Sequence, residues 1–173
     1  MATAARWIRS APDGAEALRA GWRGFARAQG ARAAPAVLWA REEGGGFAFA
    51  LAVPLRFLPG RSRRWREWAL APVIATYRLF GERAYVDGGA LWLAGAPIAG
   101  CEVVEAGDCA VFHSGFLAQL PRPRAGWSER GLEAAFRGRL EAQHGWQFDN
   151  GWPTEVERQA ISGALAGESV DAR

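Results

Sequence analysis

The chain has 173 residues, half of them hydrophobic, with a formal net charge of +3 and a sequence pI of about 9.5. All 21 of its basic residues are arginine. The absence of lysine excludes Schiff-base lysines, the lysine of the phosphate-binding loop and the kinase strand lysine, and arginine cannot replace them as a base. The length fits one α/β domain, which we expect to cover residues 1–173 with frayed ends at 1–10 and 166–173.

Two cysteines, Cys101 and Cys109, are too few for a disulfide framework. No apolar run of signal-peptide length follows the first residues, and no stretch approaches the length of a membrane span. We therefore expect a cytoplasmic protein with reduced thiols and no membrane span. The arginine content has three open interpretations: codon bias, recognition of phosphates or carboxylates, and nucleic-acid binding.

The first half of the chain combines helical patterns with apolar runs. Hydrophobic residues three or four apart predict a helix over residues 11–30, with Asp13 as its N-cap. Residues 35–41 and 47–57 are apolar runs on either side of a glycine-rich turn, which predicts a hairpin with a deeply buried second strand. A second helix is predicted over residues 64–80, with Pro72 as a position that can kink it.

Short strands and turn signals follow. Strands are predicted over residues 83–86, 90–93, 98–105 and 109–119, which together form an antiparallel meander. Ser128 is expected to cap a third helix over residues 129–144, and a fourth helix is expected over residues 155–165. This order of elements predicts an α+β fold, with a mixed, largely antiparallel sheet packed with helices.

One stretch of the meander, Leu91-Trp92-Leu93-Ala94-Gly95-Ala96-Pro97-Ile98-Ala99-Gly100, resembles the biotin/lipoate protein ligase and octanoyltransferase superfamily. That family has a strand, a turn of the type Gly-x-Lys, and then Ile/Val-Ala-Gly opening the next strand. Here Gly95 is followed by Pro97 where the lysine belongs. The order of elements agrees with the family over residues 34–165. The resemblance implies the ligase catalytic-domain fold, lipoate, octanoate or biotin as the acyl ligand, and a lipoyl or biotinyl carrier domain as the partner.

The departures from this pattern bear on activity. The family lysine holds the carboxylate and phosphate of the acyl-adenylate, which Pro97 cannot do. The expected Arg/Gly-rich loop is matched only by residues 41–46, where Glu42 and Glu43 would repel a phosphate. The resemblance therefore implies a divergent domain that binds the acyl ligand or carrier domain without lysine-dependent adenylation, a possible pseudoenzyme. The alternatives are an active ligase or acyltransferase with altered residues, using ATP or an acyl-adenylate, and a small basic nucleic-acid-binding domain.

Several residues are candidates for the site. If residues 98–105 and 109–119 pair around residue 107, Cys101 lies opposite His113 and the two could form a nucleophile–base dyad. The alternatives are a small core cysteine and a structural histidine. On the resemblance, the expected ligand-binding residues are Arg41, Gly45, Gly95, Pro97, Ile98, Ala99, Gly100 and Ser114.

Charged residues elsewhere give weaker signals. Arg61, Arg63 and Arg64 are expected to contact a phosphate or an acidic carrier domain, unless they are only the solvated start of a helix. His144 ends a helix, where an imidazolium suits the dipole. The cysteines and histidines lack the close spacing of a zinc site, so no metal is predicted. Glu102 and Glu105 are three apart in a strand and should face opposite sides, which argues against a paired-carboxylate mechanism.

Overall fold

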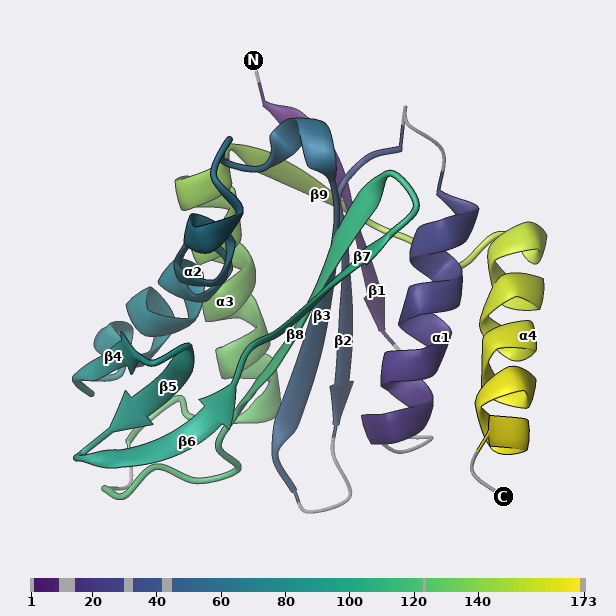
Figure 1. Cartoon of the computed structure of the whole chain (residues 1–173). Coiled ribbons are helices and arrows are strands. Elements are labelled where there is room, and N and C mark those ends of the chain that lie inside the picture. Colours follow the sequence, from purple (N-terminus) through teal and green to yellow (C-terminus); the bar gives the residue numbers. More distant parts are fainter. Residues whose placement is uncertain (1, 10–14, 30–32, 42–44, 123, 172–173) are drawn as a thin grey trace.

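A computed structural model describes residues 2–9, 15–29, 33–41, 45–122 and 124–171, with the backbone alone for residues 15–20 and 164–171. A six-stranded sheet forms its centre (Figure 1). Its strands lie in the order β7 (Glu102–Ala106), β8 (Cys109–Phe116), β3 (Phe47–Pro54), β2 (Ala36–Arg41), β1 (Thr3–Arg9) and β9 (Trp146–Asn150). β1 is parallel to both β2 and β9, and the other neighbours are antiparallel. The predicted mixed, largely antiparallel sheet is confirmed.

A second, three-stranded antiparallel sheet contains β4 (Ala84–Asp87), β5 (Ala90–Leu93) and β6 (Ala96–Gly100). Helices α1 (Ala15–Ala28) and α4 (Glu155–Asp171) cover one face of the large sheet, and α2 (Trp65–Leu79) and α3 (Glu129–His144) cover the other (Figure 1). Short 3₁₀ turns at Leu55–Phe57 and Ser62–Arg64 connect β3 to α2. No helix in the described part of the chain is long and apolar enough to cross a bilayer.

The two faces of the large sheet carry different side chains. Strand β3 is buried throughout, as predicted, and alternates large apolar residues with alanine. Its Phe49 and Leu51 belong to the core beneath α2 and α3, where Phe49 packs against Phe136 with ring centroids 4.6 Å apart. Its Ala50 and Ala52 face α1. Small residues on that side let helices pack closely, and a Cβ at Gly21 of α1 would lie 2.9 Å from Ile161 of α4.

Local signals account for α3. The Ser128 hydroxyl accepts a hydrogen bond from the Gly131 amide at 3.2 Å, so Ser128 caps the helix as predicted. Gly145 ends it in the left-handed conformation, with a φ of 67°. The predicted buried stripe is confirmed, because Leu132, Phe136 and Leu140 are all fully buried.

The chain ends differ from the sequence-based expectation. Residues 1–10 were expected to be frayed, but Thr3–Arg9 form β1, an interior strand of the large sheet. The fourth helix runs beyond the predicted residue 165 to Asp171, so most of the supposedly frayed segment 166–173 is helical. The fraying prediction is therefore wrong for residues 3–9, because long-range pairing fixes β1. The expected N-cap, Asp13, lies outside the described residues.

The predicted meander is split between the two sheets. The expected strand over residues 98–105 is broken at Cys101, so that its first part belongs to β6 and its second part to β7. The Cys101 amide instead donates to the Gly89 carbonyl at 3.4 Å. The hairpin of β7 and β8 thus extends the large sheet, while β4–β6 remain separate.

Candidate functional site

The segment that resembles the ligase turn lies at the margin of the small sheet. Ala94 and Gly95 form the tight turn between β5 and β6, with positive φ values of 51° and 82°. Pro97 follows on β6 opposite Trp92, with its ring exposed. Because β6 is an edge strand of its sheet, it tolerates a residue that lacks an N–H. The position that the resemblance gives to lysine therefore carries an uncharged pyrrolidine ring.

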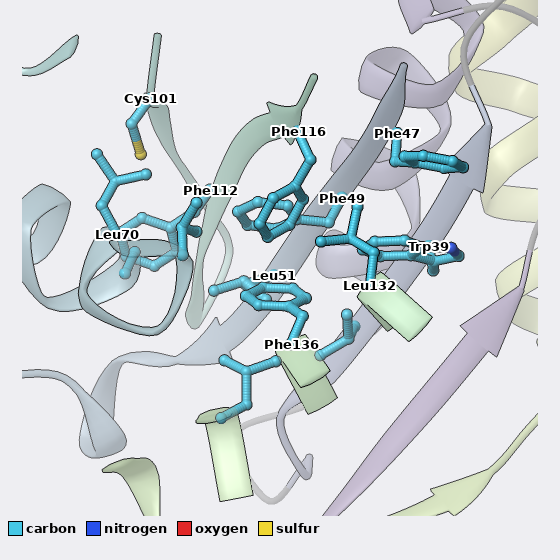
Figure 2. Close-up of a cluster of buried hydrophobic side chains, with 14 of the residues drawn as sticks. Trp39, Phe47, Phe49, Leu51, Leu70, Cys101, Phe112, Phe116, Leu132 and Phe136 are labelled. Atoms are coloured by element: carbon cyan, nitrogen blue, oxygen red, sulfur yellow. The ribbon is translucent and has the colours of Figure 1, made fainter. Parts of the chain in front are cut away.

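The residues that follow Pro97 turn toward the core. Ile98 and Ala99 pack against the main hydrophobic cluster, whereas Gly100 is exposed. Cys101 is only 6% exposed and belongs to the same cluster, where Figure 2 shows its sulfur next to Leu70. Burial raises the pKa of the Cys101 thiol to about 12, and the positive charge of Arg66 opposes this only in part. The thiol is therefore neutral at physiological pH.

His113 does not meet Cys101. In the β7–β8 hairpin, His113 lies opposite Glu102, because Ala106 is paired with Cys109 and the turn is centred one half-residue later than expected. Glu102 accepts a hydrogen bond from Arg23 of α1 at 2.9 Å, which places this pair on the α1 face. Cys101 packs on the opposite side, in the core beneath α2 and α3. The predicted dyad is wrong, since a shift of one residue in a strand moves a side chain to the other face.

Glu102 and Glu105 face opposite sides of the sheet, as predicted. Glu102 lies opposite His113 and Glu105 lies opposite Ala110, and these two partners are three positions apart on β8, so their side chains point to opposite faces. Among the residues that the structure describes, no group of three His, Cys, Asp or Glu side chains could hold a metal ion.

The predicted ligand-binding residues at the other end of the large sheet are only partly visible. Arg41 ends β2 with its side chain exposed, and Gly45 has a φ of 86° near Ala118. Residues 42–44, which complete the expected Arg/Gly loop, lie outside the described residues. Ser114 of β8 lies opposite Phe49 of β3, and its buried hydroxyl has no hydrogen-bond partner among the described residues.

Sequence analysis did not single out Trp39. It lies on β2 opposite Phe49, so that Phe49 is between Trp39 and Ser114. Its indole Nε1 is also buried, and no described residue forms a hydrogen bond with it. Figure 2 shows Trp39 among the rings of Phe47, Phe49 and Phe136. An unsatisfied buried polar group costs about 1–3 kcal/mol, so Trp39 and Ser114 are two polar atoms that a ligand could satisfy. Only the three-strand register brings them into one row, and no local sequence pattern indicates it.

The predicted arginine cluster borders a groove. This arginine groove, of about 510 Å³, is lined by Ser62, Arg63, Trp65 and Arg66 at the start of α2 and by Val103, Val104 and Glu105 of β7. Arg63 and Arg66 are exposed, as are the adjacent Arg61 and Arg64. Within the described residues, none of these four guanidinium groups forms an ion pair or a side-chain hydrogen bond, unlike those of Arg6, Arg9 and Arg137.

The electrostatics of this helix start are unfavourable for folding. Arg61, Arg63 and Arg64 precede α2, whose first turn holds only one acidic residue, Glu67. Cations near the positive end of a helix dipole destabilise the helix by about 0.3–1 kcal/mol each. The Trp65 indole is fixed beside them by its hydrogen bond to the Pro59 carbonyl at 2.8 Å. The groove thus presents unpaired positive charge next to a rigid aromatic ring.

Comparison with known proteins depends on structure alone, because no family model and no curated protein matches the sequence. A chain from the structure of a bi-partite lipoate protein ligase and its E2 lipoyl domain from Thermoplasma acidophilum has a TM-score of 0.77 at 10% identity, covering 95% of this chain and 92% of its own. A lipoate-protein ligase A bound with ATP has a TM-score of 0.75 at 11% identity, with 96% and 95% covered. The biotin acetyl coenzyme A carboxylase synthetase of Helicobacter pylori has a TM-score of 0.53 at 14% identity, with 97% and 81% covered.

The chain therefore has the fold shared by lipoate and biotin protein ligases. Within that fold it resembles the two lipoate ligases more than the biotin enzyme, because the former match nearly end to end at higher TM-scores. The fold implied by the sequence resemblance is confirmed.

Proposed function

We propose that this protein uses the lipoate-ligase fold to bind a lipoyl or biotinyl carrier domain without catalysing lysine-dependent adenylation. The observation that carries this proposal is Pro97. It stands where the family pattern has lysine, and the chain contains no lysine anywhere else that could supply the missing ammonium group. A proline ring can neither neutralise nor orient the carboxylate and phosphate of an acyl-adenylate.

The thiol chemistry of the chain supports a role without catalysis. A cysteine nucleophile needs a base or a positive environment that produces the thiolate. Burial raises the pKa of Cys101 to about 12, and His113 lies on the opposite face of the sheet. Acyl transfer through a cysteine would therefore lack its activated nucleophile.

The arginine groove favours a protein partner. Its exposed and unpaired guanidinium groups suit the surface carboxylates of an acidic domain, which they would attract before contact. The T. acidophilum structure that shares this fold was determined for a ligase and its E2 lipoyl domain. A carrier domain is therefore the partner that best combines the fold with the charge of this surface.

Isothermal titration against purified lipoyl and biotinyl carrier domains, each in the modified and unmodified form, tests binding. Incubation with ATP, carrier domain and lipoate, octanoate or biotin then tests catalysis through pyrophosphate release and the intact mass of the carrier. We expect binding without pyrophosphate release or a mass increase, with an active lipoate ligase as the positive control. A carrier domain that gains an acyl group in the presence of ATP would contradict the proposal and favour an active ligase.

Free acyl ligand is a second candidate, favoured by the unpartnered polar atoms of Trp39 and Ser114. A carboxylate or carbonyl oxygen could accept from either group, within an aromatic surround that suits an alkyl chain. Titration with lipoate, octanoate and biotin tests this directly. Binding that weakens in a Ser114→Ala variant would support it, whereas no heat with any of the three ligands would reject it.

A further inference from the structure

The arginine groove lies along an open edge of the large sheet. β7 is the last strand in the sheet order, and in the described part of the chain no strand pairs with its outer side. Its residues Val103, Val104 and Glu105 form one wall of the groove, and the start of α2 forms the other. A groove beside a free strand edge is the arrangement to which an extended segment can add as a further strand.

The register shows which backbone groups face outward. The β7–β8 hairpin closes on the two-residue turn Gly107-Asp108, with Ala106 opposite Cys109. Residues that flank such a turn exchange both hydrogen bonds, and the pattern then alternates along the strand. Val104 therefore bonds to β8, whereas Val103 and Glu105 direct their N–H and C=O groups away from it.

The bonds on the other side of β8 agree with this assignment. The Leu55 amide donates to the Asp108 carbonyl at 2.9 Å, where the chain continues the β3–β8 ladder. The same two-residue alternation then assigns Ala110 and Phe112 to bonds with β3 and leaves Val111 for bonds with Val104. The free donors and acceptors of β7 are thus at the two groove residues Val103 and Glu105.

The charge around this edge selects the occupant. Arg63 and Arg66 line the groove, and Arg61 and Arg64 lie exposed beside it, against one acidic lining residue, Glu105. Arg66 also lies against Gly89 of the β4–β5 turn, where a Cβ would come within 3.4 Å of its Nη1 atom. The Arg66 side chain is therefore positioned between the groove and the β4–β5 turn.

We propose that the arginine groove binds an extended acidic protein segment, which adds to β7 as a seventh strand and places its carboxylates against Arg63 and Arg66. Alternate side chains of such a strand point to one side, about 7 Å apart, so acidic residues at every second position can face the arginines together. Apolar residues between them point to the other face of the sheet, on which Val104 lies. This inference goes beyond the proposed function, because the segment need not belong to a carrier domain.

Fluorescence anisotropy with a labelled six-residue peptide of alternating valine and glutamate tests the proposal. We expect the full-length protein to bind this peptide and to bind the corresponding valine–lysine peptide at least about tenfold more weakly. The same glutamate peptide with N-methylated alternate amides should also lose about tenfold, because it cannot complete the strand ladder. Equal binding of the glutamate and lysine peptides would overturn the proposal.

Two pairs of variants separate charge from backbone pairing. The double variant R63E/R66E should weaken binding at least about tenfold, whereas R78E, at the other end of α2, should remain within about twofold of wild type. Glutamate at a helix N-terminus favours the helix, and thermal unfolding of the double variant separates a loss of binding from a loss of fold. Equal affinity of the double variant and R78E would overturn the proposal.

The backbone test uses Glu105, whose N–H faces the groove and whose side chain is exposed. Glu105→Pro removes that N–H and Glu105→Ala keeps it, while both remove the charge. Glu105→Pro should bind at least about tenfold more weakly than Glu105→Ala, with thermal unfolding showing that both are folded. Equal affinities, or complete competition by a thymidine oligonucleotide, would instead identify a general anion site and overturn strand addition.

Discussion

Both cysteines behave as small core residues. Cys101 is 6% exposed and Cys109 is fully buried, and burial raises the pKa of each thiol. With a pKa of about 12, only about one Cys101 molecule in ten thousand is a thiolate at pH 8. The thiolate is the reactive form, so burial suppresses reactivity twice, through ionisation and through access.

Alkylation with iodoacetamide should therefore distinguish the folded from the unfolded protein. At pH 8 we expect neither cysteine of the native protein to be modified on the time scale on which a free thiol reacts completely. Both should react after unfolding in guanidinium chloride, which intact-mass spectrometry would show as two additions. Rapid modification of native Cys101 would indicate an accessible, activated thiol, and acyl transfer through this cysteine would again be a candidate activity.

His144 differs from its sequence-based interpretation. A position at the end of α3 suggests a cation that suits the helix dipole, but the ring is stacked on Trp68, with centroids 4.0 Å apart, and lies 4.8 Å from Trp146. Burial lowers its pKa to about 4, and its Nε2 has no hydrogen-bond partner in the part of the chain that the structure describes. Desolvation by the two indoles outweighs the helix dipole, and the ring is neutral at pH 7.

This burial makes stability depend on pH. Between about pH 6.5 and 4 the unfolded chain binds a proton at His144 that the folded chain does not, so stability is full above pH 6.5 and falls as the pH decreases. From pH 7 to pH 5 the contribution of this group is about 2 kcal/mol. A His144→Phe variant keeps a ring at this position but cannot titrate, so it should lose about 2 kcal/mol less than wild type in urea unfolding over that interval. Parallel losses in both proteins would contradict the assignment.

At the scale of elements, the α4 start is fastened by a buried carboxylate. Glu157 and Thr154 form a reciprocal cap, in which the Thr154 amide donates to Glu157 at 2.6 Å and the Glu157 amide donates to the Thr154 hydroxyl at 3.3 Å. Arg6 of β1 donates to both Glu157 oxygens, at 2.6 and 3.0 Å. Burial alone would raise the pKa of Glu157, but these hydrogen bonds together lower it. One side chain thus caps the helix and ties it to the sheet.

Replacing this carboxylate should loosen α4. Glu157→Ala leaves Nη1 of Arg6 and the Thr154 amide without their acceptor, although Nη2 of Arg6 still donates to the Trp152 carbonyl, and we expect the free energy of unfolding to fall by about 2 kcal/mol. The matched control is Glu155→Ala, two positions earlier in the first turn of α4, where an exposed carboxylate contacts only Arg158 and Gln159 among the described residues. The control should be indistinguishable from wild type in urea unfolding. Equal effects of the two substitutions would show that the buried contact has no special weight.

Elements with strong local signals were predictable. The predicted bounds of α3 coincide with those observed, because Ser128, the buried stripe and Gly145 all act within a few residues of each other. β1 was not predicted, because its stability comes from pairing with β2 and β9, which lie further along the chain. Its Arg6 and Arg9 look like surface residues in the sequence, but they pair with Glu157 and Glu133 respectively. β9 carries an alternating pattern in Trp146 and Phe148, but five residues are too few to distinguish a strand from a loop.

The site was predictable only as isolated parts. The run of arginines before α2 is visible in the sequence, whereas its position beside the β7 edge depends on how the chain turns at Cys101. The Cys101–His113 prediction failed because it required the exact strand register. The turn is centred half a residue later than expected, so His113 pairs with Glu102, whose side chain points to the opposite face from that of Cys101. Trp39 and Ser114 share a row only through their common neighbour Phe49.

For the whole molecule, the unequal faces of the large sheet give the fold its layers. Bulky rings meet α2 and α3, and alanines meet α1, so the two helical layers are not interchangeable (Figure 1). This asymmetry follows from the alternation of large apolar residues with alanine along β3. It explains why the general architecture could be inferred from the sequence and from the family resemblance. The division into two sheets could not be inferred from the sequence, because it depends on a single break at Cys101 between β6 and β7.

The parallel pairing of β1 with β9 also sets the order in which the molecule can be completed during synthesis. Residues 3–9 are synthesised before their outer neighbour in the sheet, residues 146–150, which follows about 140 residues later. At about 5–20 residues per second, the earliest strand waits several seconds with one side open. Until residues 146–150 are synthesised, β1 exposes an unpaired edge that can recruit another polypeptide, so the nascent chain is vulnerable to misassembly throughout this interval.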